Sequence, residues 1–503
     1  MVKTKTKKIY DFNMPGIKNG LVKVLKKRKN ESTIADLVAD SGIPKYQVEQ
    51  TIKVILNEYR GHLKATESGE LIYYFPYGMR NQVKGFIPAL KRFLSKSIKI
   101  ISRILAFLFK VWIMVMLIGY FILFLVILIG AVVGAIALSA AGSKGRSSRG
   151  SKGGIFFLVF KLFELFARIW FYGQLLKGPQ YHKKGRSLHK AVFAFIFGEP
   201  DPNKDWETEE KKYVISYIQS HKGIITLLEL MAITGKDSEV TNQLLNRYLI
   251  EYEGEPSVTD AGTIYYFFPE LLKTSESLTM RKLINLNNPV RKEPIPFNYN
   301  MKKKNGWIAF FNGFNLAFGS YFLYYALTSP DLVLEYVQRG KQLLIDFAII
   351  YRFVNWFLTD LVSNPSGLIL IVLGIIPLIF SFFFYLIPII RNIQRKKQNE
   401  LIKQENLSKK IYHYVHRYPS RIEIKAITPK DDDESPKNYV QFTEKVIKRL
   451  AGEKYGEVEA VQDGSYYYSL QEVERENRDI ESIRESIDLN KYAVGDTVFD
   501  SGE

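Results

Sequence analysis

Histidine is the first residue type to consider as a source of chemistry, because its side chain binds metals and transfers protons near neutral pH. The chain has six histidines among 503 residues. His413 and His416 lie three positions apart, so one face of a helix would carry both of them. No aspartate or glutamate lies nearby at a spacing that would complete a metal site. We therefore interpret the pair as ordinary helix residues and expect no metal site.

Other kinds of catalytic chemistry find no support in the residue types. The chain has no cysteine, which excludes disulfides, thiolate catalysis and clusters or metals held by thiolates. It contains no phosphate-binding P-loop, no dinucleotide-binding glycine pattern and no nucleophile elbow. The acidic run 431–434 lies in a polar insertion, where such charges are solvated. We expect a protein that is not an enzyme and needs no cofactor.

Phosphate binding is the remaining chemistry that the composition suggests. The formal net charge is +19, and the excess of lysine and arginine is concentrated in the N-terminal part. A basic region indicates a nucleic acid or an anionic membrane surface as its neighbour. On the predicted helix over residues 45–59, the side chains suited to DNA contact are Lys45, Gln47, Gln50 and Lys53. Glu49 and Glu58 on the same helix oppose them, so we do not expect DNA to be the partner.

Three soluble blocks of the sequence repeat one order of features. Within 190–273, apolar residues at helical spacing predict three helices, and strand-forming residues then flank a turn at 260–262. The block 1–82 repeats this order, and the block 405–470 repeats it with a polar insertion at 429–437. Three helices followed by a β-hairpin describe a winged helix. The sequence therefore predicts three winged-helix-like modules.

Aromatic residues near the second block are candidates for docking. Phe193, Phe195 and Phe197 alternate as they would in a short strand, and we expect this linker to dock the module against the membrane or its neighbours. Tyr265 and Tyr266 lie in the predicted hairpin of the same block. They are either core residues of that hairpin or part of an exposed docking surface.

The apolar residues gather in blocks long enough to cross a membrane. A helix needs roughly 20 residues to cross about 30 Å of hydrocarbon. The block 104–141 exceeds one upright span and has basic residues on both flanks, which predicts a transmembrane hairpin, with one long span as the alternative. Residues 305–328 and 366–390 are two further spans, again with basic residues at their outer ends. We predict about four transmembrane helices in two hairpins.

The remaining segments are predicted from their composition. They are a basic amphipathic segment over 83–103, a Gly/Ser-rich basic linker over 142–154, an amphipathic interfacial or membrane helix over 155–177, an amphipathic helix over 331–363, and an acidic tail over 471–503. We expect the tail to begin as a helix and to end in disorder. Charges inside a membrane are costly and tend to be functional, so a transporter or channel, which is an alternative function, would use Lys110, Asp346 or Arg352.

Part of the sequence resembles a known family. Residues 191–203 (AVFAFIFGEPDPN) are similar to the F-x-F-x-F-G-x-x-D-P-N element of an uncharacterised cyanobacterial and chloroplast membrane-protein family. Residues 251–259 (EYEGEPSVT) and 262–269 (GTIYYFFP) are similar to its wing. The resemblance implies a membrane protein with repeated winged helices. Some plant members carry an iron–sulfur cluster biosynthesis label, which we do not transfer to a chain without cysteine.

The fold class that we predict is an α-helical membrane protein with soluble α+β domains. The expected function is that of a membrane-anchored scaffold or adaptor, with the lipid bilayer, another protein and a second copy of the chain as partners. We expect an inner or plasma membrane, with the soluble modules on its cytoplasmic side. A membrane-bound DNA-binding regulator and a transporter or channel subunit are the alternatives from other functional classes.

Overall fold

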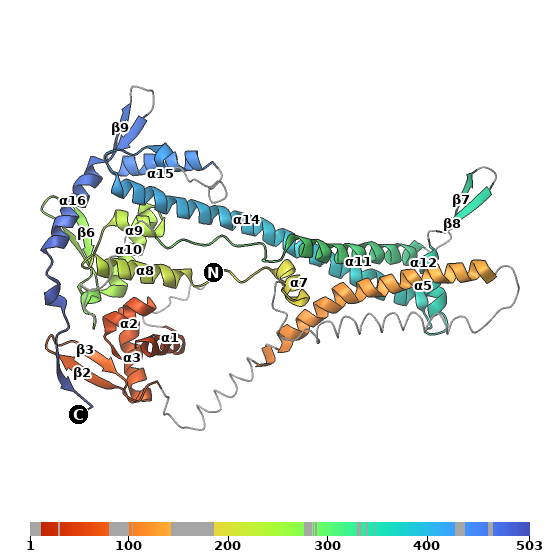
Figure 1. Ribbon diagram of the computed structural model, residues 1–503, viewed down its shortest axis with the longest axis horizontal. Coiled ribbons are helices and arrows are strands. Elements are labelled where there is room, and N and C mark those ends of the chain that lie inside the picture. Colours follow the sequence, from red (N-terminus) through yellow and green to blue (C-terminus); the bar gives the residue numbers. More distant parts are fainter. Residues whose placement is uncertain are drawn as a thin grey trace, which may run out of the picture. The chain divides into compact units, whose positions relative to one another are not determined.

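The computed structural model describes residues 12–28, 31–79, 100–102, 104–141, 186–275, 284, 286, 289–328, 333–338, 341–346, 348–427, 438–460 and 466–502. These residues form mostly helices, with several small antiparallel sheets (Figure 1). The chain divides into two compact units. The first unit comprises Met1–Ala89, Asp201–Ile295 and Lys397–Glu503, and the second comprises Leu90–Pro200 and Pro296–Lys396.

The first module of the first unit contains three helices and three strands. In chain order they are α1 (Met14–Lys27), β1 (Glu31–Ser32), α2 (Ile34–Ser41), α3 (Lys45–Tyr59), β2 (His62–Thr66) and β3 (Leu71–Tyr74). Thr33 and Asp36 form a reciprocal capping box that begins α2. Gly42 ends the same helix with a φ of 68°, a conformation that glycine adopts without strain.

The second module repeats this order of elements. It contains α8 (Trp206–Ser220), β4 (Ile224–Ile225), α9 (Leu227–Thr234), α10 (Ser238–Tyr252), β5 (Glu255–Val258), β6 (Ile264–Phe267) and the 3-10 helix η2 (Pro269–Leu272). Thr226 and Glu229 form the capping box of α9, and Gly235 ends that helix with a φ of 71°. The short strand β4 pairs with β6, as β1 pairs with β3 in the first module.

The third module is a divergent version of the same arrangement. It uses the end of α14 (Ile376–Arg417), the 3-10 helix η5 (Ile424–Ile427), α15 (Tyr439–Glu453), β9 (Glu457–Ala460) and β10 (Tyr466–Ser469). Ile422 forms an isolated antiparallel bridge with Tyr468 of β10. This bridge takes the place that β1 and β4 have in the other two modules.

A glycine joins the last helix to the hairpin in each module. Gly61, Gly254 and Gly456 each donate a backbone hydrogen bond to the carbonyl five residues earlier, at 2.9, 3.0 and 2.7 Å. The residue before each glycine has a φ of 50–53°. A Cβ atom at any of the three glycines would lie within 3.0 Å of a neighbouring atom. The same sharp helix ending therefore recurs three times.

One hydrophobic core links the three modules. It contains, for example, Leu37 of α2, Tyr217 of α8 and Ile447 of α15, all at most 1% exposed. Val473, which lies beyond the third module, is also buried in this core. The modules of the first unit consequently share their apolar interior.

The acidic tail is folded, contrary to the disorder expected at its end. It forms α16 (Gln471–Ser486), the 3-10 helix η7 (Leu489–Tyr492) and β11 (Thr497–Asp500). Strand β11 pairs with β2, so the sheet of the first module has the order β1-β3-β2-β11 (Figure 1). The prediction considered only composition, whereas the tail gains its order from long-range pairing with the modules.

In the second unit, residues 104–141 form one continuous helix and not the expected hairpin. The helix includes a π-helical segment, η1 (Val115–Gly119), and continues as α5 (Tyr120–Ala141). The alternative of one long span agrees with this helix. Its apolar run contains no proline and no polar turn residues, so the glycines remain helical and the helix satisfies its own backbone groups.

The other elements of the second unit are mainly helical. They are α7 (Leu188–Phe197), α11 (Lys302–Thr328), α12 (Ile349–Leu358), α13 (Pro365–Leu368), the π-helical η4 (Ile369–Ile375) and the start of α14, together with the hairpin of β7 (Val333–Gln338) and β8 (Lys341–Asp346). The helix expected over 331–363 is wrong for its first half, because β7 and β8 are strands. Residues such as Val333, Tyr336 and Val337 favour extended backbone.

Neutral polar side chains connect the helices of the second unit at the π-helical segments. Asn315 of α11 is fully buried and donates to the carbonyls of Met116 and Leu117 in η1, at 3.3 and 2.9 Å. The hydroxyl of Tyr120 donates to the carbonyl of Val372 in η4, at 2.9 Å. A π-helical turn offers backbone carbonyls that neighbouring side chains can bind, and these contacts use them.

Among the described residues, two helices are long and apolar enough to cross a membrane, judged by length and composition. They are Ile100–Gly134 and Pro365–Arg417, and the part of the second helix from Lys397 onwards belongs to the first unit. The predicted segments 142–154 and 155–177, and nearly all of 83–103, lie outside the described residues.

The close contact at Gly456 gives a test of the repeated helix ending. A Cβ atom there would lie 2.9 Å from the Cβ of Ala451 and 3.3 Å from Leu470. We expect Gly456→Ala to lower the free energy of unfolding by about 1–3 kcal/mol, as overpacking does. Urea unfolding of the full chain in detergent, followed by hydrogen exchange in α15, measures the effect.

Gly452, inside α15, provides the matched control. A Cβ atom there would meet nothing within 4 Å. Gly452→Ala should stabilise the module by up to about 1 kcal/mol, because alanine favours the helix. Equal effects of the two substitutions would contradict the close contact at Gly456.

Candidate functional site

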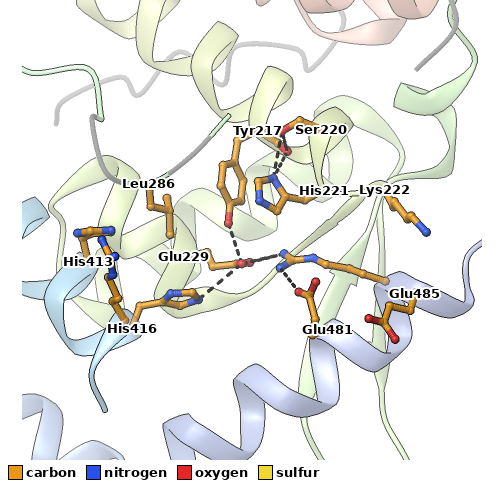
Figure 2. Close-up of a pocket in the computed structure, with 12 residues that line it drawn as sticks. Tyr217, Ser220, His221, Lys222, Glu229, Leu286, His413, His416, Glu481 and Glu485 are labelled. Carbon is orange, nitrogen blue, oxygen red and sulfur yellow. Dashed lines mark hydrogen bonds and ion pairs between the residues drawn. The ribbon is translucent and has the colours of Figure 1, made fainter. Parts of the chain in front are cut away.

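The first unit contains a polar cavity of about 580 Å³ between the second module, the end of α14 and α16 (Figure 2). Its lining brings together charged and imidazole side chains from three distant parts of the sequence. The lining residues are Tyr217, Ser220, His221, Lys222, Glu229, Leu286, His413, His416, Arg417, Glu481, Arg484 and Glu485.

Glu229 is the buried charge at the wall of this cavity, and its side chain is 1% exposed. The hydroxyl of Tyr217 donates to Glu229 Oε1 at 2.7 Å, and Arg484 Nη2 donates to both carboxylate oxygens at 2.8 and 2.9 Å. The backbone N–H of Thr226 donates to Oε2 at 2.8 Å. His416 Nε2 lies 3.8 Å from Oε1 (Figure 2). The carboxylate is therefore saturated with donors.

Local structure at the start of α9 helps to position Glu229. Glu229 is the third residue of α9 and closes its capping box with Thr226. A carboxylate also suits the first turn of a helix, because the helix dipole is positive there. The second module thus presents a buried anion, and α16 supplies the arginine that neutralises it.

Electrostatics favour the charged state of this pair. Burial alone raises the pKa of Glu229, but Arg484, His416 and the hydroxyl of Tyr217 outweigh it and hold the pKa at about 2. Burial likewise opposes the charge of Arg484, and Glu229 more than compensates by raising the pKa of the guanidinium. Glu229 is accordingly a carboxylate and not a proton donor at neutral pH.

Three of the six histidines line the cavity. The ring of His221 stacks on that of Tyr217 with centroids 3.9 Å apart. Burial is the main cause that lowers the pKa of His221, His413 and His416 below the ordinary value of 6.5. The rings are neutral at pH 7. Within the described residues, no group of three or more acidic or histidine side chains could hold a metal ion.

The arrangement holds α16 against the second module. Its only buried carboxylate is already bound by three donors, and the arginine is bound to that carboxylate. We call Glu229, Tyr217 and Arg484 the tail latch, because they join α16 to the second module. Lys222 adds a hydrogen bond to the carbonyl of Ile487, just after α16, at 3.2 Å.

The residues predicted to contact DNA lie together on α3, but Lys45 is already paired. Its Nζ lies 2.6 Å from Glu253 and 2.8 Å from Glu270, both in the second module. Burial opposes its charge, yet these two partners raise the pKa of Lys45. Gln47 donates to the hydroxyl of Tyr46 at 2.8 Å, whereas Gln50 and Lys53 are exposed.

The predicted docking residues separate into two places. Phe193, Phe195 and Phe197 lie in the helix α7 of the second unit, so their assignment to a strand and to the second module is wrong. The run from Leu188 to Phe197 lacks turn residues and buries its apolar side chains among helices, which explains the helix. Tyr265 and Tyr266 lie in β6 and are partly buried, as expected for hairpin residues.

The three charges proposed for a transport pathway occupy different elements. Lys110 lies on the first apolar helix, with Nζ 4.8 Å from the ring centroid of Phe193. Asp346 ends strand β8, and Arg352 lies in α12. The buried polar groups of this unit are instead Asn312, Asn315 and Ser381, which a search for charges overlooks.

Sequence reasoning also missed the tail latch. The signal for Glu229 was present as a capping-box pattern, threonine followed by glutamate three residues later. Nothing in the sequence connects this glutamate to Arg484, which lies 255 residues further along the chain. His413 and His416 were correctly placed on one helix, but the cavity beside them was not expected.

These features define a mostly helical protein with small sheets, two long apolar helices and a tail latched to its folded modules. The chain is similar to an uncharacterised chloroplastic protein of Arabidopsis thaliana, with 22% identity over 386 residues, 74% of this chain and 68% of the relative. That coverage is too long to fall within one module. No protein-family model matches the chain. No solved structure matches it either.

The tail latch predicts a large effect of neutralising its arginine. In Arg484→Leu, Glu229 would remain buried without its counter-charge, so we expect a loss of about 3–5 kcal/mol in the free energy of unfolding. Hydrogen exchange in the full-length protein should show that α16 and β11 lose protection before the second module does. The double variant Glu229→Met/Arg484→Met should recover most of the loss.

Arg478 on the same helix is the matched control. Its side chain is 74% exposed, with one weak ion pair to Glu474 at 4.0 Å. Arg478→Leu should change the unfolding free energy by less than about 0.5 kcal/mol. If both arginine variants released the tail equally, the latch would not be what holds it.

The pKa shifts predict that stability falls as the pH falls. The lowered pKa values of the three histidines mean that the unfolded chain binds protons first, so stability declines once the pH drops below about 6.5. The contribution of Glu229, about 3 kcal/mol, is present above its ordinary pKa of 4.5 and is lost as the pH falls towards 2. Unfolding free energies at successive pH values test this. Glu229→Gln should flatten the dependence below pH 4.5, and His416→Gln should reduce it just below pH 6.5.

Proposed function

We propose that this chain is a non-enzymatic, membrane-anchored scaffold whose winged-helix-like modules bind protein. The two long apolar helices would anchor it in a bilayer, and the first unit would form the platform that partners contact. The modules would bind as one body, because they share a core and the tail joins them.

The order of elements supports the winged-helix interpretation. In the first two modules, a short strand follows the first helix and pairs with the last strand of the hairpin. In the third module, the bridge between Ile422 and Tyr468 has the same role. Three helices and a wing in this order are the elements of a winged helix.

The surroundings of α3 support a protein partner over DNA, and this observation carries the proposal. A recognition helix reads DNA with residues near its N-terminus, which must enter the major groove. The N-terminus of α3 instead faces the second module, where Lys45 pairs with Glu253 and Glu270. Next to it, the hydroxyl of Tyr252 donates to the carbonyl of Gly42 at 3.3 Å. A DNA duplex would have to displace these contacts.

The equivalent helix of the second module, α10, also supports a protein partner over DNA. On α10, Arg247 pairs with Glu251 at 2.6 Å and with Glu207 at 3.4 Å. Glu239 at the start of α10 adds negative charge where phosphates would approach, and Asp237 beside it pairs with Arg449 at 3.3 Å. Phosphate contacts require unpaired lysine and arginine side chains, and the pairing on α10 opposes them.

The setting of the proposed scaffold is a membrane. The similarity to a chloroplastic protein supports a chloroplast membrane, as an alternative to the inner or plasma membrane that the sequence suggested. Basic residues flank both long apolar helices, which favours placing the modules on the side that collects lysine and arginine. Because the three modules share one core, all of them would face the same compartment, which requires a return crossing beside each long helix, as in the predicted total of about four transmembrane helices.

The absence of cysteine allows a direct test of this arrangement. Single cysteines replacing Ser68, Ser257 and Ser420 place one reporter in each module. In sealed vesicles containing the full chain, we expect an impermeant maleimide to label all three from the same side. The chain should also stay with the membrane after carbonate extraction. Labelling from opposite sides, or release into solution, would contradict the proposal.

Measuring DNA binding over a series of salt concentrations distinguishes a DNA-binding regulator from the proposed scaffold. Full chain in nanodiscs should show no sequence-selective shift of duplex DNA, and any weak binding should be the same for Lys45→Ala. A DNA regulator would instead bind tightly, lose affinity steeply with salt, and lose further affinity in Lys45→Ala.

A further inference from the structure

Three hairpin positions of the first unit are structurally equivalent, yet their outer edges differ. Each follows the connecting glycine by two residues and lies opposite a tyrosine of the next strand. The pairs are Leu63 with Tyr73, Pro256 with Tyr266, and Val458 with Tyr468. Along an antiparallel pair, residues alternate between exchanging backbone hydrogen bonds with the partner strand and turning their N–H and carbonyl away from it. The outward-facing backbone groups at these three positions can therefore be compared directly.

In the first module, the chain's own C-terminal segment occupies the edge. The N–H of Ser501 donates to the carbonyl of Leu63 at 2.9 Å, and the N–H of Leu63 donates to Ser501 Oγ at 2.8 Å. The backbone groups of Leu63 therefore face outwards and bind an added segment. The ladder also places Lys64 of β2 opposite Asp500 of β11, and the Nζ of Lys64 lies 3.1 Å from Glu31 of β1.

In the second module, proline closes the edge. Thr259 donates a backbone hydrogen bond to Thr263 at 2.9 Å, and the alternation from that pair turns the backbone of Pro256 outwards. Proline has no N–H, so β5 offers no donor at the position that corresponds to Leu63 and Val458, although Val258 also faces outwards. Proline on an edge strand is a common protection against such pairing.

In the third module, the edge is open. Tyr468 exchanges both backbone hydrogen bonds with Ile422, at 2.8 and 3.0 Å, so it does not bond Val458. The N–H and carbonyl of Val458 consequently face away from β10. All four residues of β9 are exposed, and Val458 is 60% exposed. Among the described residues, no further strand pairs with β9 (Figure 1).

The charge of β9 defines the strand that fits it. Glu457 and Glu459 lie on either side of Val458, and Glu459 accepts a hydrogen bond from the hydroxyl of Tyr467 on β10, so the open edge carries two acidic residues. Opposite charges at facing positions stabilise an antiparallel pair, so its occupant should carry lysine or arginine at alternate positions. It should also contain β-branched residues, which favour extended backbone.

We propose that the open edge of β9 binds the N-terminal segment 2–8 of a second copy of this chain as an added β-strand. That segment reads Val-Lys-Thr-Lys-Thr-Lys-Lys, in which Lys3, Lys5 and Lys7 alternate with threonine and no acidic residue occurs. Main-chain hydrogen bonds to Val458 would provide affinity, and the lysines would pair with the glutamates of β9. The inference deepens the proposed scaffold by naming one of its partners.

A peptide of residues 1–11 tests this edge directly. We measure its binding by fluorescence anisotropy to the chain with residues 2–8 deleted, in detergent at fixed salt. Val458→Pro, which copies Pro256 of the second module, should weaken binding at least tenfold. Glu457→Lys/Glu459→Lys should weaken it similarly and should favour a peptide with glutamate at positions 3, 5 and 7.

The reverse substitution is the matched control. Pro256→Val should leave the affinity at β9 unchanged and should restore an outward N–H to β5. Unfolding midpoints of all variants confirm that each is folded. Equal binding of the peptide to the parent and to Val458→Pro would overturn the proposal, as would binding only to anionic vesicles.

Cross-linking in the full chain establishes whether the pairing joins two copies. One tagged copy carries Lys5→Cys and a differently tagged copy carries Ala460→Cys. We expect a disulfide between the two tags, and we expect it to disappear when Val458→Pro is added to the second copy. A link formed only within one chain, in a molecule carrying both cysteines, would overturn pairing between copies. These readouts need neither a membrane nor another partner, so their failure would leave the proposed scaffold intact.

Discussion

The burial of Glu229 is the constraint on which the first unit depends. A carboxylate inside a protein is costly unless counter-charge and donors surround it, and here Arg484, Tyr217 and the start of α9 provide them. Because the arginine belongs to α16, the buried charge of the second module is neutralised only when the tail is in place. The end of the chain is thereby part of the fold and not an appendage.

From this latch, the tail continues to β11 and closes the sheet of the first module. The side chains of Val498 and Phe499 on β11 are 68% and 62% exposed, so main-chain pairing holds this strand more than burial does. Three similar hairpins thus have three different edges, one occupied, one closed by Pro256 and one open at Val458. An edge strand that is neither paired nor blocked can bind other strands through its free N–H and carbonyl groups.

The second unit depends on neutral hydrogen bonds where the first depends on charge. Its π-helical segments offer carbonyls that Asn315 and Tyr120 bind, and these contacts join helices across an otherwise apolar interior. Such residues give little signal in a sequence, because asparagine and tyrosine are unremarkable in a helix. The charges Lys110, Asp346 and Arg352 attracted attention instead and lie on separate elements.

Local patterns in the sequence determined the helices and hairpins of the three modules, the capping box at Thr226 and Glu229, and the apolar blocks. Helical periodicity, turn residues and hydropathy act over short distances, so these features can be predicted without a fold. Local features also explain the single helix over 104–141 and the strands β7 and β8, although the sequence prediction weighed those features differently. Only the tertiary structure decided that the acidic tail is ordered. It also decided that Glu229 meets Arg484 and that Lys45 is neutralised by Glu253 and Glu270. These outcomes depend on contacts between residues far apart in the chain, whose free energy no local pattern contains.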